Sequence, residues 1–285
     1  MITVRLMGGL GNQLFQYATA YSISKLQKTE LVLDKRFFDT NNQHGGYRLE
    51  KLNIPNLSVV ATEHEKPKWK VNLITKIPML DWIIDTKIIH ESRFQGAHTI
   101  PDHALLLGYW QDSKYFSQNL KEFREFFVPV SITSKVSSER LEMQKLNSVS
   151  VHIRRGDYIT NPEALRNHGI CSIAYYTKAI NYVLEKVKNP TFYIFSDDVS
   201  WVEDNLAKLF KANDSFYMIG NSQEEDLWLM SNAKHHIVAN SSFSWWGAYL
   251  ASGNKQIVVS PFPWFDIPQK YTVDPSLSGW KRVIK

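Results

Sequence analysis

The second half of the chain alternates short apolar segments with helical segments, and this alternation restricts the fold more than any other feature. Five segments predict strands, at residues 148–153, 191–195, 216–219, 236–239 and 256–259. Four segments between them predict helices, at residues 173–187, 201–210, 224–230 and 244–251. Strands separated by helices lie parallel, because each helix returns the chain to the same end of the sheet. The pattern predicts a doubly wound, Rossmann-like sheet.

A similar unit opens the chain. Residues 2–7 predict a strand that meets glycines, a helical pattern follows, and residues 30–33 predict a second strand. Prolines interrupt the pattern from about residue 37 to residue 131, where only residues 105–107 resemble a buried strand. We therefore expect an α/β protein with two Rossmann-like lobes, at residues 1–140 and 141–285, and a ligand in the cleft between them.

Composition excludes several classes of protein. Hydrophobic residues make up 44% of the 285, enough for real cores, and the single cysteine, Cys171, forms no intramolecular disulfide. The N-terminus lacks the pattern of a signal peptide, and no apolar run approaches the roughly eighteen residues of a membrane span. The net charge of +5 suits an anionic substrate, but no nucleic-acid-binding motif accompanies it. These features predict a cytoplasmic protein that does not bind nucleic acid.

Two adjacent arginines follow the first strand of the second half. Arg154 and Arg155 carry guanidinium groups, whose planar fork of donors matches phosphate oxygens. Successive side chains of a strand face opposite ways, and Arg154 shares a face with His152. We expect Arg154 to contact the anion first and Arg155 to brace the loop or reach the substrate across the turn. The alternative is an arginine pair that forms a salt bridge with Asp157.

Small hydroxyl residues follow the strand at 236–239. Ser241 and Ser242 precede a helix whose first amide hydrogens have no partner within the helix, and such an N-terminus can bind phosphate. The alternative is a plain N-cap with Trp245 and Trp246 in the core.

Two carboxylates, Asp197 and Asp198, follow the strand at 191–195. An aspartate pair can hold a divalent cation, accept hydrogen bonds from a purine edge or a ribose, or simply form a turn that caps a helix. The arginines already supply positive charge for a diphosphate, which argues against a metal ion. His235 and His236 lack partners at the spacing of metal ligands, so we expect them to be structural.

The glycine loop at residues 8–11 allows a close approach of backbone to ligand, and Asn12 can donate to a leaving or attacking oxygen. Leu14 occupies the third glycine position of a dinucleotide fingerprint, which weakens the case for a nicotinamide dehydrogenase. An ordinary strand-to-helix turn is the alternative.

Four blocks, in this order, resemble the bacterial and animal α-1,2-fucosyltransferases of glycosyltransferase family 11. They cover residues 7–17, 152–158, 195–198 and 240–248. The two most specific are His152-Ile153-Arg154-Arg155-Gly156-Asp157 and Asn240-Ser241-Ser242-Phe243-Ser244-Trp245-Trp246. Residues 37–130 match poorly.

The resemblance implies a glycosyltransferase fold of the B type (GT-B) and inverting, metal-independent transfer of L-fucose. The donor would be GDP-β-L-fucose, and the acceptor the 2-hydroxyl of a β-galactoside in an oligosaccharide or a lipid-linked glycan. Animal members carry a membrane anchor that this chain lacks, which favours the bacterial, cytosolic branch with at most peripheral membrane contact. By position, the residues expected at GDP-fucose are Gly9, Gly11, Asn12, His152, Arg154, Arg155, Asp197, Asp198, Ser241, Ser242 and Phe243.

Breaking the fucose–phosphate bond builds negative charge on the departing diphosphate, so fixed donors there are the main expected source of catalysis. Arg154 and the helix capped by Ser241 and Ser242 are the predicted donors to the diphosphate, and Asn12 is a third predicted catalytic residue. Asp157 is the candidate base for the acceptor hydroxyl, although a dissociative path with little base assistance is equally open. Another GT-B enzyme with a different nucleotide sugar or fucosyl linkage, and a non-catalytic glycan-binding protein, remain the alternatives.

Overall fold

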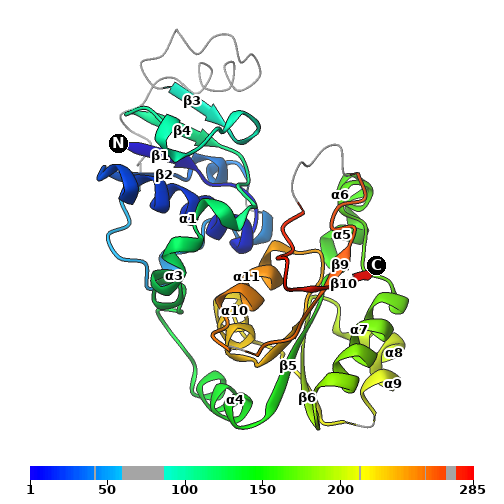
Figure 1. The fold of residues 1–285 in the computed structure, drawn as a ribbon. Helices are drawn as coiled ribbons and strands as arrows, with labels where there is room; N and C mark the ends of the chain where they lie inside the picture. Colours follow the sequence, from blue (N-terminus) through cyan, green and yellow to red (C-terminus); the bar gives the residue numbers. More distant parts are fainter. Residues whose placement is uncertain (42, 60–86, 212, 254, 268–273) are drawn as a thin grey trace. The chain divides into compact units, whose positions relative to one another are not determined.

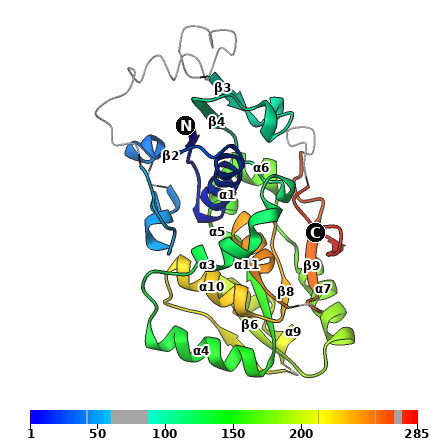
Figure 2. The same ribbon diagram turned by 60° about the vertical axis from the view of Figure 1, so that its left-hand side comes forward.

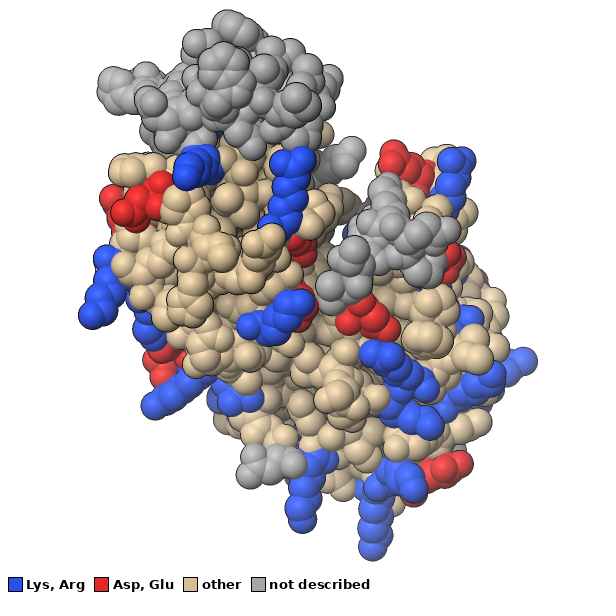
Figure 3. Space-filling view, turned by 45° about the horizontal axis from the view of Figure 1, so that its top comes forward, with Lys and Arg blue, Asp and Glu red and all other residues tan. Residues whose placement is uncertain are grey.

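The computed structural model describes residues 1–41, 43–59, 87–211, 213–253, 255–267 and 274–285. Contacts divide the chain into two compact units, Met1–Phe126 and Phe127–Lys285. None of the helices within these ranges is both long enough and apolar enough to cross a membrane. On the face seen in Figure 3, the blue Lys and Arg side chains mostly stand apart, with uncharged surface between them.

The first unit contains a parallel four-stranded sheet in the order β2-β1-β4-β3 (Figure 1). Its strands are β1 (Ile2–Arg5), β2 (Leu31–Asp34), β3 (Lys87–His90) and β4 (Ala104–Leu107). The helices described in this unit are α1 (Leu10–Gln27) and α3 (Leu120–Phe126). Short 3-10 turns connect them, at Arg36–Asp39, Gln43–Gly45, Leu49–Lys51, Glu91–Arg93, Ala97–Thr99, Ser113–Tyr115 and Ser117–Asn119. Strand β4 is apolar and buried throughout, and Ile2, Thr3 and Val4 of β1 are buried, as expected of central strands that are covered on both faces.

The second unit contains a parallel six-stranded sheet in the order β10-β9-β8-β5-β6-β7. The strands are β5 (Asn147–Ile153), β6 (Pro190–Ser196), β7 (Ser215–Tyr217), β8 (His235–Ile237), β9 (Val258–Phe262) and β10 (Lys281–Ile284). Counted from β5, this order is 3-2-1-4-5-6, which is the order of the Rossmann fold.

Eight helices are described in the second unit. They are α4 (Ser134–Lys145), α5 (Gly156–Thr160), α6 (Pro162–His168), α7 (Ile173–Lys186), α8 (Val199–Asn205), α9 (Ala207–Phe210), α10 (Gln223–Asn232) and α11 (Ser242–Leu250). Helices α10 and α11 pack side by side (Figure 2). At Gly247 of α11, an added Cβ would lie 2.7 Å from the Cβ of Met230 on α10. The glycine is therefore required by the packing of these two helices.

The predicted α/β fold with parallel sheets is confirmed, and all five predicted strands of the second half are present. The sequence did not reveal β3 and β10. Only Ile88 of β3 and Val283 of β10 are buried, since both strands lie at the edge of a sheet. An edge strand needs no continuous apolar run, so its sequence resembles a loop.

The order of the second sheet identifies where a ligand is expected. The chain leaves β5 towards β6 and leaves β8 towards β9, on opposite sides, although β5 and β8 are hydrogen-bonded neighbours. At such a switch point the connecting loops diverge and leave a crevice outside the carboxyl ends of the strands. The loops after β5 and β8 flank this position.

Candidate active site

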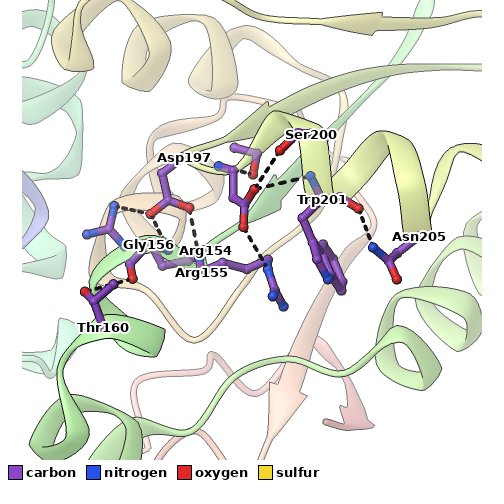
Figure 4. A network of polar contacts seen from close by, with 10 residues as sticks. Arg154, Arg155, Gly156, Thr160, Asp197, Ser200, Trp201 and Asn205 are labelled. Atoms are coloured by element: carbon purple, nitrogen blue, oxygen red, sulfur yellow. Dashed lines mark hydrogen bonds and ion pairs between the residues drawn. The ribbon is translucent and has the colours of Figure 1, made fainter.

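The carboxyl ends of β5 and β6 bring the paired arginines and the paired aspartates together (Figure 4). The Asp197 carboxylate accepts hydrogen bonds from the backbone N–H groups of Arg155 (2.9 Å) and Gly156 (3.1 Å). It also forms an ion pair with the guanidinium of Arg154, with 3.0 Å between Nη1 and Oδ2. An added Cβ at Gly156 would lie 2.7 Å from Oδ2 of Asp197. Asp197 therefore fixes the loop after β5, and Gly156 permits its close approach.

Arg155 has a different environment from Arg154. Its Nε lies 3.2 Å from Oδ2 of Asp198, and its guanidinium stacks 3.7 Å from the ring centroid of Trp201. Asp198 in turn caps α8 by accepting from the N–H of Trp201 at 3.2 Å. Figure 4 shows the two arginines pointing in different directions, as the alternation of strand side chains predicts. Arg155 thus braces the loop against α8.

Arg154 is the more accessible of the two arginines. Its side chain is 26% exposed, against 14% for Arg155, and its guanidinium lies 5.9 Å from the ring centroid of Tyr158. The predicted alternative partner of the arginines, Asp157, lies in α5, but its side chain is outside the described part of the structure. The carboxylates that the structure places on the arginines are Asp197 and Asp198.

The N-terminus of α11 lies at the carboxyl end of β8, the neighbour of β5. Ser241 is its N-cap, and its Oγ accepts from the N–H of Phe243 at 3.3 Å. The preceding Asn240 is buried, and its Nδ2 donates to the carbonyls of His168 (2.7 Å) and Gly169 (3.2 Å). This anchors the loop. The partly exposed Ser242 starts the helix, where N–H groups and the helix dipole favour an anion.

His152 lies between the carboxyl end of β5 and the start of α11, which follows β8. The ring is buried on β5 and lies 5.6 Å, between centroids, from the ring of Phe243 on α11. Burial lowers its pKa well below the ordinary value; the charge of Asp197 opposes this and that of Arg154 adds to it, and the imidazole is neutral at pH 7. Its buried Nδ1 makes no hydrogen bond within the described residues. A buried imidazole nitrogen without a partner needs an explanation, and a bound ligand is one.

His235 and His236 have structural partners at Nδ1, whereas the buried Nε2 of His236, like Nδ1 of His152, makes no hydrogen bond within the described residues. Nδ1 of His236 lies 2.8 Å from Oγ of Ser150, and Nδ1 of His235 accepts from the N–H of Ile257 at 3.1 Å. Among the described residues, no group of three or more His, Cys, Asp or Glu side chains is placed to hold a metal ion.

His236 makes the stability of the second unit depend on pH. Burial lowers its pKa from 6.5 to about 3, so only the unfolded chain takes up the proton between these values. Stability is therefore fully present above pH 6.5 and is lost as pH falls. At pH 5 we expect His236 to lower the free energy of unfolding by about 2 kcal/mol, at 1.36 kcal/mol per unit between pH 6.5 and pH 5. Urea unfolding at pH 7 and pH 5 measures it, and the dependence should be smaller in His236→Gln and unchanged in the control His98→Gln. An unchanged pH dependence in His236→Gln would contradict this assignment.

The predicted glycine loop of the first unit is also present. Gly8 has a φ of +75°, and an added Cβ would lie 2.6 Å from Nδ2 of Asn12. Gly9 is the N-cap of α1, and Gly11 is buried in its first turn. The Oδ1 atom of Asn12 accepts a hydrogen bond of 2.8 Å from Nε2 of Gln111.

Two glutamines that the sequence did not single out hold this loop. Nε2 of Gln13 donates to the carbonyls of Gly8 and Gly46, both at 2.9 Å. Oε1 of Gln16 accepts from the N–H of Met7 at 2.9 Å, and its Nε2 donates to the carbonyl of Gly108 at 3.2 Å. Both glutamines are fully buried. The sequence signal for them was a pair of glutamines within a largely apolar helical pattern, because buried glutamine side chains are retained only where they have hydrogen-bond partners.

Comparisons with known proteins identify the family of the chain. The model of the family described as glycosyl transferase family 11 matches residues 1–283. An α-1,2-colitosyltransferase of Escherichia coli is 39% identical over 100% of this chain and 99% of its own. The O-antigen biosynthesis glycosyltransferase WbnK of Escherichia coli is 33% identical over 91% of this chain and 93% of its own.

Among solved structures, the fucosyltransferase NodZ from Bradyrhizobium has a TM-score of 0.52 at 15% identity, covering 88% of this chain and 92% of that one. This likeness concerns the fold and agrees with the predicted GT-B type. The match to the family model over nearly the whole chain, together with the two bacterial relatives, decides the family. The chain belongs to glycosyl transferase family 11.

Proposed function

We propose that the chain transfers L-fucose from GDP-β-L-fucose to the 2-hydroxyl of a terminal β-galactoside, with inversion and without a metal ion. The observation that carries this proposal is the position of Arg154, which Asp197 fixes at the end of β5. The neighbouring strand is β8, and α11 begins after its carboxyl end. A guanidinium and a helix N-terminus at one switch point supply the charge that a diphosphate needs.

These groups would act mainly on the leaving group. As the bond between fucose and phosphate breaks, the diphosphate gains negative charge, and a preorganised guanidinium stabilises it more strongly than it stabilises the bound donor. Asp197 contributes by holding Arg154 in place before the substrate arrives. The neutral His152 contributes no charge and would accept or donate one hydrogen bond in the nucleotide site.

The contacts of the two aspartates favour a supporting role. Asp197 engages both oxygens with the loop after β5, and Asp198 engages Arg155 and α8. We therefore propose that they order the diphosphate site, while binding of the base or the ribose by either remains a prediction from sequence. Asp157 likewise remains the proposed base for the acceptor hydroxyl.

Colitose is a second candidate for the transferred sugar. The relative that is 39% identical to this chain is an α-1,2-colitosyltransferase. Colitose is the 3-deoxy counterpart of L-fucose, so the choice depends on whether the site forms a hydrogen bond with the 3-hydroxyl. A site built to pair with a hydroxyl discriminates strongly against an analogue that lacks it, because its own polar group is then left unpaired.

The proposal is tested by GDP release from GDP-fucose in the presence of excess EDTA, with and without a β-galactoside. We expect release that depends on the acceptor and survives EDTA. GDP-colitose and UDP-galactose in separate reactions identify the donor class. Faster turnover of GDP-colitose would assign the second candidate, and release only from UDP-galactose would contradict the proposal.

A further inference from the structure

The turn that follows β4 has an unusual backbone. Gly108 has a φ of +150°, and Trp110, a fully buried residue, has a φ of +58°. A bulky residue in the left-handed region costs on the order of 1–3 kcal/mol, and such strain persists only where the surroundings impose it. An added Cβ at Gly108 would lie 2.5 Å from the Cβ of Glu91. The turn is therefore pressed closely against the residue that follows β3.

Glu91 holds this turn through its carboxylate. Oε2 accepts hydrogen bonds from the backbone N–H groups of Tyr109 (2.9 Å) and Trp110 (2.8 Å). The carbonyl of Gly108 also accepts from Gln16 on α1. These contacts fix the backbone immediately before Gln111 from two neighbouring elements.

The fixed turn presents the side chain of Gln111 to Asn12. Nε2 of Gln111 donates to Oδ1 of Asn12 at 2.8 Å. A primary amide has one oxygen that accepts and one nitrogen that donates, so a donor on the oxygen determines which way the amide faces. Nδ2 of Asn12 lies over Gly8, since an added Cβ there would be 2.6 Å away. The donor end of Asn12 is thereby directed along the glycine loop.

We infer that Gln111, held by the turn that Glu91 anchors, is a positioning residue that makes Asn12 a hydrogen-bond donor at the glycine loop. This rests on the proposed function, for which the sequence predicts Asn12 as a donor to a leaving or attacking oxygen. This chain of contacts from Glu91 through Gln111 to Asn12, called the relay below, explains why a strained turn is retained here. It also assigns a role to Gln111, which itself needs no contact with substrate.

A double-mutant cycle in the full chain tests the relay. Asn12→Ala is expected to lower kcat by about 10²-fold, the usual loss for one preorganised donor. In the wild-type background, Gln111→Ala should lower kcat by about tenfold and leave KM for the acceptor within about twofold. In the Asn12→Ala background, the same substitution should change kcat by less than about twofold, because the effects of residues in one network are not additive. Gln118→Ala, an exposed glutamine of the same unit, is the control and should match the wild type. Equal factors for Gln111→Ala in both backgrounds would overturn the inference.

A second measurement does not depend on activity. In NMR spectra of protein with ¹⁵N-labelled asparagine, the side-chain NH₂ signal of Asn12 is identified by its loss in Asn12→Ala. Gln111→Glu replaces the donor by an acceptor and should turn the amide over, so this signal should shift, while Gln118→Glu should leave it in place. An unshifted signal in Gln111→Glu would refute the relay even if transfer occurs. A shifted signal with no transfer from any GDP-sugar would support the relay and refute the proposed function.

Discussion

Arg154→Ala is expected to lower the rate of transfer by about 10²–10³-fold, because one preorganised donor to the leaving group is lost. The Arg154 guanidinium is positioned by Asp197 at 3.0 Å and is 26% exposed, so it is both fixed and accessible. The fold should survive, since the arginine follows β5 and lies outside its apolar core. Acceptor-dependent GDP release and a urea unfolding curve check both statements.

A second arginine variant separates the loss of a fixed donor from the loss of any arginine. Arg140 on α4 packs its guanidinium 4.9 Å from the ring of Trp228 and donates to Asn232 at 2.8 Å, away from the switch point. Arg140→Ala should therefore keep the wild-type rate. Equal losses in both variants, or full activity in Arg154→Ala, would mean that Arg154 does not stabilise the leaving diphosphate.

Asp197→Ala is expected to have the second largest effect. It removes the acceptor of two backbone N–H groups and the partner of Arg154, so the loop after β5 loses its order. Unsatisfied donors cost about 1–3 kcal/mol, less where solvent reaches them, and we expect a loss of roughly tenfold to 10²-fold in affinity for nucleoside diphosphates. Calorimetric titration with GDP and with UDP measures it.

The ratio of the two affinities decides between two roles of Asp197. A carboxylate that orders the diphosphate site weakens GDP and UDP binding by the same factor when it is removed. A carboxylate that pairs with guanine weakens GDP binding alone. We expect equal factors, with Asp197→Asn intermediate because its amide oxygen still accepts. Asp204→Ala, an exposed carboxylate on α8, is the matched control and should change neither affinity.

The sequence predicted the second unit in more detail than the first. Strands β5 and β6 are long, apolar and bounded by polar residues, so their carboxyl ends and the residues that follow could be located. The partners of those residues could not. The contact of Asp197 with Arg154 depends on the register that pairs Ile153 with Ser196, which arises only when the sheet forms.

The relay in the first unit was hidden for a related reason. Gln111 and Asn12 are separated by 99 positions, and Glu91 lies on a third segment, beside a region where prolines obscured the pattern. Neither Gln111 nor Glu91 lies in a recognisable sequence motif. Their role follows from the strained turn at residues 108–110. The sequence does not reveal this strain, because only the glycine at Gly108 hints at a positive φ and nothing marks the positive φ of Trp110.

The central claim, transfer of L-fucose to the 2-hydroxyl of a galactoside, is tested most directly by the linkage of the product. GDP-fucose labelled with ¹³C in the sugar would be incubated with a β-galactoside and the chain, and the purified product examined by NMR. We predict a correlation between the fucose anomeric carbon and the galactose H2, with the coupling of an α-linkage. A correlation to another galactose position, or a product that retains the β configuration, would contradict the account.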